Sequence, residues 1–274
     1  MQLMSLYKQI YDMEDNMIQS LVKGTPKILE QIYEDLAQPS VKAVGQALGT
    51  VFEFSTSLLL PVKLLNEKIK INFTKHLDEY KKKLESIPEE KRCEVHPQIG
   101  TPIIERLTYT TTDEIAELFT TLLANASNTD RVNLAHPSFI SIIEHLSTDE
   151  ARIIKYLKGK NEIEYCDFKG MFDVGKGYVV IIPKATLITR DVKLDFDMNI
   201  GAYLSNLVSN GILADQSGIY MVDTKVTDEI CRVNNLDELR KRYVPSPYKS
   251  IDVQRCMLEV TPFGKLFIDA CLSY

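Results

Sequence analysis

Residues 199–222, NIGAYLSNLVSNGILADQSGIYMV, decide the fold that we expect for the second half of this chain. Apolar residues recur in the first half of the stretch at helical spacing, and Gly211 follows as a residue that can end a helix in a left-handed conformation. Two short apolar runs, Ile212–Ala214 and Ile219–Val222, then flank the turn-forming residues 215–218. The stretch therefore predicts a helix followed by a β-hairpin.

The segments on either side of this stretch predict a small α+β domain. Ser147 and Glu150 form a capping box, the signature of a helix start. The other expected elements are a helix at Asp149–Lys158, strands at Glu162–Cys166, Tyr178–Ile182 and Cys256–Thr261, a turn at Gly170–Gly177 and a closing helix at Pro262–Cys271. This order predicts a winged-helix-like domain over residues 147–274, with residues 224–255 inserted in the wing.

Residues 1–146 carry helix-like patterns throughout. The clearest amphipathic helix is expected at Val62–Ser86, and the lysines 81–83 near its end are expected on a solvated face. A polar connector is expected at Ile87–Thr101, a capping box at Thr111–Glu114, and a short helix at Pro137–Leu146. We therefore predict a mainly α protein, with a helical region at 1–146 and the winged-helix-like α+β domain at 147–274.

The segment Val44–Val62 is long, apolar and carries one charge, Glu53. Its length approaches the roughly 20 residues that span a bilayer, but a charge at the middle of a bilayer helix costs about 2.5–3.5 kcal/mol. Gly45 and Gly49 are spaced four residues apart, which lets another helix approach closely. We expect a helix-packing segment here, with contact to a membrane as the alternative.

The net charge and the cysteines indicate which partners and which cellular location to expect. The net charge is −6, which divides into −5 for residues 1–146 and −1 for residues 147–274. A nucleic-acid-binding domain normally carries an excess of positive charge, so nucleic acid is not the expected partner. The five cysteines are widely spaced, and the first ten residues lack the order of a signal peptide. We expect a cytoplasmic location, with a peripheral contact to the inner membrane as the alternative.

Candidate chemistry is sparse. Cys93 and His96 have the spacing of half a zinc site, but no second pair accompanies them, so we predict no metal and no cofactor. Arg131 and His136 match the Arg-x4-His pattern of the HEPN ribonucleases, in which it lies on a helix. Here Pro137 follows the histidine and disfavours a helical conformation for it. We therefore assign no catalytic residues, and Arg131 with His136 is the candidate pair for the alternative.

The expected helix Asn199–Asn210 is the one that would enter a DNA groove if the domain bound DNA. It contains no Lys or Arg, and its Asn206 and Asn210 are the side chains available for reading bases. Without positive charge, docking on a phosphate backbone is weak. A structural or protein-binding role is therefore expected, with a winged-helix regulator as an alternative.

Several motifs, in order along most of the chain, resemble those of the Abi-alpha (abortive infection alpha) family of bacterial phage-defence proteins. They are Val44–Gly49, Leu58–Asn66, Leu84–Glu90, Glu117–Phe119 with Leu122–Ala124, His136–Phe139 and Leu146–Ala151. The resemblance implies phage resistance by abortive infection and supplies no catalytic residues. We therefore expect a defence protein that acts by protein contact, self-association or membrane contact, with a HEPN-like ribonuclease or a winged-helix regulator as the alternatives.

Overall fold

The computed structural model describes residues 63–216, 218–220 and 222–274. These residues belong to two compact units, one that ends at Ser141 and also takes in Tyr274, and one that comprises Ile142–Ser273. Within these described ranges, no helix combines the length and the apolar character that crossing a membrane would require. The candidate segment Val44–Val62, with Gly45, Gly49 and Glu53, lies outside the described residues.

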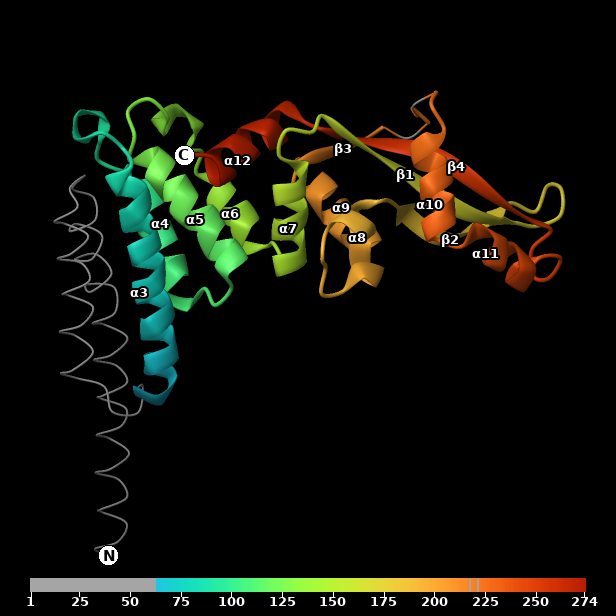
Figure 1. Ribbon diagram of the computed structural model, residues 1–274, viewed down its shortest axis with the longest axis horizontal. Coiled ribbons are helices and arrows are strands. Elements are labelled where there is room, and N and C mark those ends of the chain that lie inside the picture. Colours follow the sequence, from blue (N-terminus) through green and yellow to red (C-terminus); the bar gives the residue numbers. More distant parts are fainter. Residues whose placement is uncertain (1–62, 217, 221) are drawn as a thin grey trace, which may run out of the picture. The chain divides into compact units, whose positions relative to one another are not determined.

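The first unit is helical (Figure 1). Its elements are α3 (Lys63–Glu85), η1 (Glu89–Lys91), α4 (Pro97–Tyr109), α5 (Asp113–Ala126) and η2 (Val132–Leu134), and α6 (Ser138–Glu144) starts in this unit. Helices α3, α4 and α5 pack against one another. Their contact buries Leu77, Tyr80, Leu84, Ile103, Leu107, Leu118, Phe119 and Leu122.

The amphipathic helix predicted at Val62–Ser86 is confirmed as α3, as far as the described residues reach. Phe73, Leu77, Tyr80 and Leu84 of its expected apolar face are all buried. The Tyr80 hydroxyl lies 2.8 Å from the Ser127 hydroxyl, so the polar end of this buried ring also has a partner. Helical spacing was sufficient to identify this face.

Three local predictions for this unit are wrong. The expected connector at 87–101 is shorter, because α4 already begins at Pro97, where proline is tolerated and His96 caps the helix. The capping box expected at Thr111 and Glu114 is not the helix start, because the N-cap of α5 is Thr112 and its side chain makes no capping hydrogen bond. Lys83 is buried rather than solvated, and its ammonium donates to the hydroxyls of two threonines in α5.

The second unit is a mixed α+β structure built on an antiparallel sheet. The strands are β1 (Glu162–Met171), β2 (Tyr178–Ala185), β3 (Leu213–Gln216) and β4 (Ser250–Val260), in the order β2-β1-β4-β3. The helices are α7 (Thr148–Leu157), α8 (Ile188–Asp191), α9 (Ile200–Ser209), α10 (Lys225–Val233), α11 (Leu236–Tyr243) and α12 (Pro262–Leu272), with a 3-10 turn η3 (Asp197–Asn199).

Three local signals of the second unit are confirmed: a capping box, a helix stop and a turn. Ser147 and Glu150 form a complete capping box at the start of α7. Gly211 has φ 73°, and the Ile212 amide donates to the Leu207 carbonyl 3.0 Å away, so the glycine ends α9 in the left-handed conformation that few other residues adopt. The glycine-rich stretch is the turn between β1 and β2. Short-range chemistry therefore determines these boundaries.

The predicted hairpin across residues 215–218 is wrong. Strand β3 pairs with β4, with Leu213 opposite Val260, and residues 219–220 are not in a strand. Pairing with β4 buries both Leu213 and Val260, whereas Ile219 and Tyr220 remain about half exposed. The prediction of a mainly α protein is also too narrow, because the second unit contains a four-stranded sheet and is α+β. The winged-helix arrangement predicted for this unit is not confirmed.

One face of the sheet is covered by the segment that we had expected to be an insertion in the wing. Buried residues of the strands, Cys166, Phe168, Ala185 and Ile251, pack with Ile230 of α10, and side chains of α11 surround them. Tyr165 precedes Cys166 in β1 and therefore belongs to the other face of the sheet, where it lies opposite Cys256 of β4. Residues 224–255 thus form part of the core of this unit.

Candidate functional site

Arg131 lies at the end of the first unit, just before the turn η2. Its guanidinium donates from Nε to the Asn125 side-chain oxygen at 2.7 Å, and Asn125 is 1% exposed. The turn η2, rather than an α-helix, separates Arg131 from His136. Arg131 therefore has a structural role in satisfying a buried amide of α5.

His136 is exposed and stands at the start of α6. Its Nδ1 accepts a hydrogen bond from the Ser138 amide at 3.2 Å and lies 2.6 Å from the Ser138 hydroxyl. The His136 side chain thus provides a partner for the first amide of α6, and its ring also contacts Phe139, with the centroids 5.6 Å apart. The histidine thus has a local role, as the proline that follows it indicated.

Cys93 and His96 also have partners within the fold. The Cys93 thiol lies 3.6 Å from the Ala126 carbonyl, and burial raises the pKa of this thiol. His96 Nδ1 accepts from the Gln98 amide at 3.2 Å and caps α4. Among the described residues, no three His, Cys, Asp or Glu side chains are grouped closely enough to hold a metal ion.

The asparagines of α9 are engaged inside the second unit. Asn206 donates from its side-chain nitrogen to Glu150 at 2.7 Å, and Asn210 donates to the Asn206 side-chain oxygen at 3.1 Å. Base readout needs asparagine amides that are free to form a bidentate pair with a base. Because Glu150 and Asn210 occupy the Asn206 amide, α9 is better suited to hold α7 than to read DNA.

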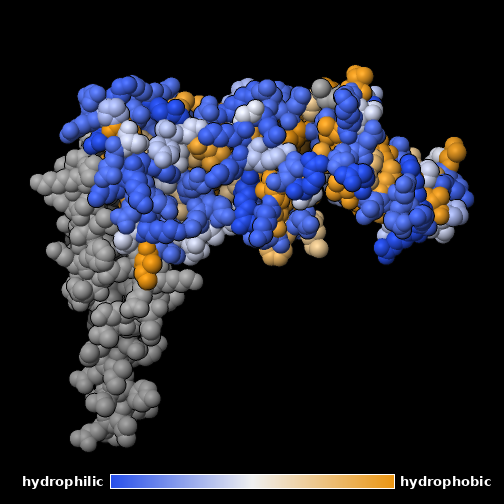
Figure 2. Space-filling view, in the orientation of Figure 1, coloured by the Kyte–Doolittle hydropathy of each residue, from blue (hydrophilic) through white to orange (hydrophobic). Residues whose placement is uncertain are grey.

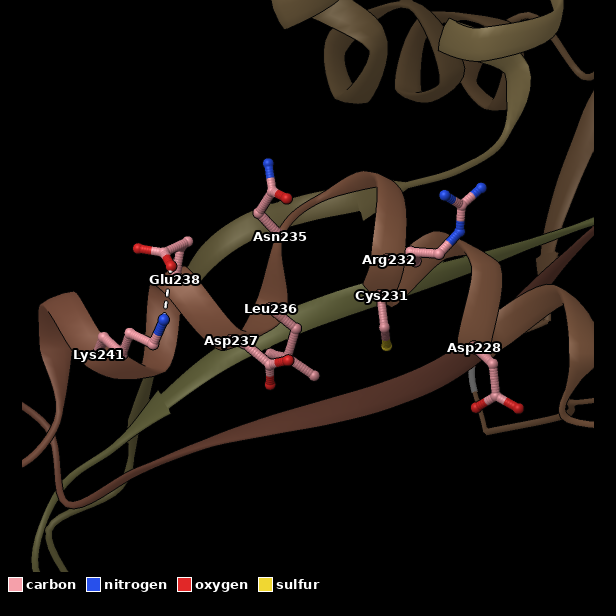
Figure 3. A pocket seen from close by; sticks show the side chains of 8 residues that line it. All are labelled: Asp228, Cys231, Arg232, Asn235, Leu236, Asp237, Glu238 and Lys241. Carbon is pink, nitrogen blue, oxygen red and sulfur yellow. Dashed lines mark hydrogen bonds and ion pairs between the residues drawn. The ribbon is translucent and has the colours of Figure 1, made fainter.

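A surface hollow of about 480 Å³ lies on the consecutive helices α10 and α11 (Figure 3). Carboxylates of Asp228, Asp237 and Glu238 outnumber the cations Arg232 and Lys241 in its lining. Lys241 pairs with Glu238 at 2.7 Å, and Arg232 pairs with Glu229 at 2.5 Å. Asp237 is also paired, with Arg240 at 3.7 Å, so most of the charges around the hollow balance one another.

Cys231 is the one nucleophilic side chain in the lining of this hollow. Burial raises the pKa of its thiol, with the charge of Asp228 adding to the effect. A thiol with a raised pKa is a poor nucleophile at neutral pH, because the thiolate is the reactive form. The hollow is thus suited to binding rather than to thiol chemistry.

A second feature of this unit is the segment Asp195–Asn199, which connects α8 to α9 (Figure 1). Its Phe196 is 62% exposed and its Met198 is 87% exposed. Most of the face drawn in Figure 2 is hydrophilic, with hydrophobic side chains gathered in smaller patches. Two large apolar side chains close in sequence are thus exposed, and covering them would remove apolar area from water.

The backbone of this segment is held by a buried carboxylate, Asp149 of α7. Asp149 is 2% exposed and accepts hydrogen bonds from the Asp195 amide at 2.8 Å, the Phe196 amide at 3.0 Å and the Tyr203 hydroxyl at 3.0 Å. Burial alone would raise the pKa of this carboxyl, but these hydrogen bonds and the charge of Arg152 hold it below its usual value. Asp149 is therefore ionised at neutral pH and fixes the exposed segment.

The sequence prediction missed this arrangement, although a signal was present. Asp195, Phe196, Asp197 and Met198 alternate acidic and apolar residues. Alternation alone does not separate a half-buried strand from an exposed loop. The exposure of Phe196 and Met198 became evident only with the fold.

A family model described as abortive infection alpha matches residues 66–271, well over half of the 274 residues. No curated protein matches the chain.

One solved structure is similar: that of the uncharacterized protein from the hydrocarbon-degrading marine bacterium Alcanivorax borkumensis SK2, with 14% sequence identity and a TM-score of 0.34. The match covers 52% of this chain and 94% of that chain. This likeness is too low to support an inference about fold or function.

Proposed function

This chain belongs to the abortive infection alpha family, and from that premise we propose that it protects a bacterial cell against bacteriophage by abortive infection. The observation that carries the proposal is the match of the family model over residues 66–271. The match includes the described helices of the first unit from residue 66 onward and the whole sheet of the second. The proposal therefore concerns both units.

We further propose that the chain acts through contacts with proteins rather than by catalysis. The support is the use that the fold makes of its polar side chains. Arg131 is bonded to a buried amide, His136 caps a helix, and Asn206 is bonded to Glu150. In contrast, the large apolar side chains of Phe196 and Met198 are exposed, which is the property that a protein-binding surface needs.

The two alternatives have less support. A HEPN-like ribonuclease would need Arg131 and His136 on one helix, whereas the turn η2 separates them. A winged-helix regulator would need basic side chains on α9, and its sequence contains none. Membrane contact through Val44–Val62 is a separate proposal, supported by the composition of that segment alone.

The test is a phage challenge of bacteria with and without the gene. A panel of phages is applied at low and high multiplicity, and plaque number, burst size and cell survival are recorded. Abortive infection predicts fewer plaques at low multiplicity, and death of infected cells before phage release at high multiplicity. Equal plaque numbers in both strains across the panel would contradict the proposal.

The membrane alternative is tested with the same cells. The proposal of protein contact predicts that the full chain stays in the supernatant after ultracentrifugation of lysed cells. Recovery in the membrane pellet, resistant to a high-salt wash, would instead support contact through Val44–Val62. A cytoplasmic marker and an inner-membrane marker serve as the controls.

A further inference from the structure

The segment Asp195–Asn199 presents an apolar pair between acidic residues. Phe196 and Met198 are exposed, and Asp195 and Asp197 flank Phe196 on both sides. Acidic flanks repel the phosphates of nucleic acids and of anionic lipids. The chemistry of the segment therefore favours a protein surface that combines an apolar hollow with a positively charged rim.

Such a surface exists on the same unit of this chain. An open hollow of about 490 Å³ is lined by Arg152, Lys155, Tyr156, Asp191, Val192 and Lys193. Three cations and one carboxylate line the hollow. Asp191 is paired with Arg190 at 2.7 Å, and Arg152 is paired with Asp149 at 3.2 Å and with Asp195 at 3.1 Å. Tyr156 and Val192 supply apolar surface. The hollow thus has the charge and the apolar lining that the exposed segment would need in a partner.

The segment and the hollow are neighbours in one chain. Arg152 lines the hollow and also pairs with Asp195 at 3.1 Å, and Lys193 is three residues before Phe196. When two complementary surfaces lie side by side, a twofold axis can bring both into contact at once, each segment meeting the hollow of the other copy. Two equivalent contacts then form in a single closed interface.

The segment is also fixed in advance of any contact. The buried carboxylate of Asp149 accepts the backbone amides of Asp195 and Phe196, and it pairs with Arg152 at 3.2 Å. A segment that is already ordered loses little conformational freedom when it binds. This rigidity favours a small interface that would be too weak if the loop had to be ordered on association.

We propose that a second copy of this chain binds the hollow, so that Phe196 of each copy enters the hollow of the other and Asp197 faces Lys193. Each Phe side chain can bury about 150–250 Å². The interface is small, so the dimer is weak, with a dissociation constant expected in roughly the micromolar range. This inference does not depend on the proposed role in phage defence.

The first test is sedimentation velocity of the full chain at concentrations from about 1 to 100 µM. The wild-type chain is expected to shift from monomer to dimer over this range. Phe196→Ser should raise the dissociation constant about tenfold or more, since a buried aromatic is typically a hot spot. Val174→Ser is the matched control, because Val174 is equally apolar and fully exposed in the β1–β2 turn, and this variant should dimerise like the wild type.

The second test uses charge reversal and its rescue. Asp197→Lys and Lys193→Glu should each abolish dimerisation, whereas the chain that carries both changes should recover it, because the pair is restored with its signs exchanged. Thermal unfolding of each variant provides the control for loss of folding. A monomeric wild type at all concentrations, a dimeric Phe196→Ser variant, or a double variant that fails to recover would overturn the proposal.

Discussion

His76 is the buried histidine of this chain. It is 1% exposed, whereas the other three histidines, His96, His136 and His145, are exposed. Its Nδ1 lies 3.4 Å from the Leu107 carbonyl, so it links α3 to α4. Burial lowers the pKa of the imidazole below its ordinary 6.5, and the Leu107 hydrogen bond opposes this shift. The folded state therefore favours the neutral ring.

A direction for the pH dependence of stability follows from His76. Below about pH 6.5 the unfolded chain binds a proton at this site that the folded chain does not, so stability should fall as the pH falls from about 7 to 5. Urea unfolding at several pH values should show this slope in the wild type. His76→Leu should reduce the slope, whereas His136→Ala should retain it. An unchanged slope in His76→Leu would contradict the assignment.

At the scale of elements, α3 shows how one run of lysines divides between solvent and core. Lys82 is exposed, whereas Lys83 is 9% exposed and donates to the Thr121 hydroxyl at 2.6 Å and the Thr120 hydroxyl at 2.8 Å. Lys83 lies in a stripe of α3 with His76 and Tyr80, at spacings of four and three residues. Since all three are buried, the buried face of α3 is wider than its apolar residues indicated.

Lys83→Ala should therefore destabilise the chain, and Lys82→Ala should not. Removing Lys83 leaves buried hydroxyls of α5 without their donor, and hydrogen bonds to a charged group are worth about 1.5–3 kcal/mol. A change at an exposed position is usually within about 0.5 kcal/mol of neutral. Free energies of unfolding from denaturant titration measure both variants. Equal effects for the two lysines would contradict the assignment of Lys83 to the core.

The helix starts offer a second contrast between elements. The Ser147 hydroxyl accepts from the Glu150 amide at 3.2 Å and completes a capping box on α7, whereas Thr112 at the start of α5 makes no such bond. Ser147→Ala should cost about 1 kcal/mol of stability, and Thr112→Ala should cost less. Thermal unfolding of the two variants, measured side by side, tests this order. A larger loss for Thr112→Ala would reverse it.

At the scale of the whole molecule, the phage challenge can separate contact from catalysis. His136→Ala and Arg131→Ala should keep their protection, because the two side chains have roles in local structure. Arg131→Ala should lower stability by about 1–2 kcal/mol through loss of the Arg131–Asn125 hydrogen bond, which is small beside the roughly 5–15 kcal/mol of a typical domain. Thermal unfolding provides the folding control. Loss of protection in both variants, with folding intact, would instead support a ribonuclease.

The features of the fold that could be predicted from the sequence are those that depend on residues close to one another along the chain. The apolar stripe of α3, the capping box at Ser147, the stop at Gly211 and the β1–β2 turn all depend on residues within a few positions of one another. Backbone hydrogen bonding and helical or strand periodicity act over this distance, so a single sequence contains the information. The motifs that resemble the family are local in the same sense, and the family match confirms the resemblance over residues 66–271.

The tertiary structure decided the rest, since these features depend on residues far apart in the chain. Strand β3 pairs with β4 across more than forty positions because this pairing buries Leu213 and Val260, which the adjacent residues 219–220 could not do. Lys83 is buried because α5 provides hydroxyls for its charge. Phe196 is exposed because Asp149, on another helix, fixes the backbone around it. Burial of apolar area and hydrogen bonding of buried polar groups are properties of the assembled fold. The spacing of residues along the chain therefore does not predict them.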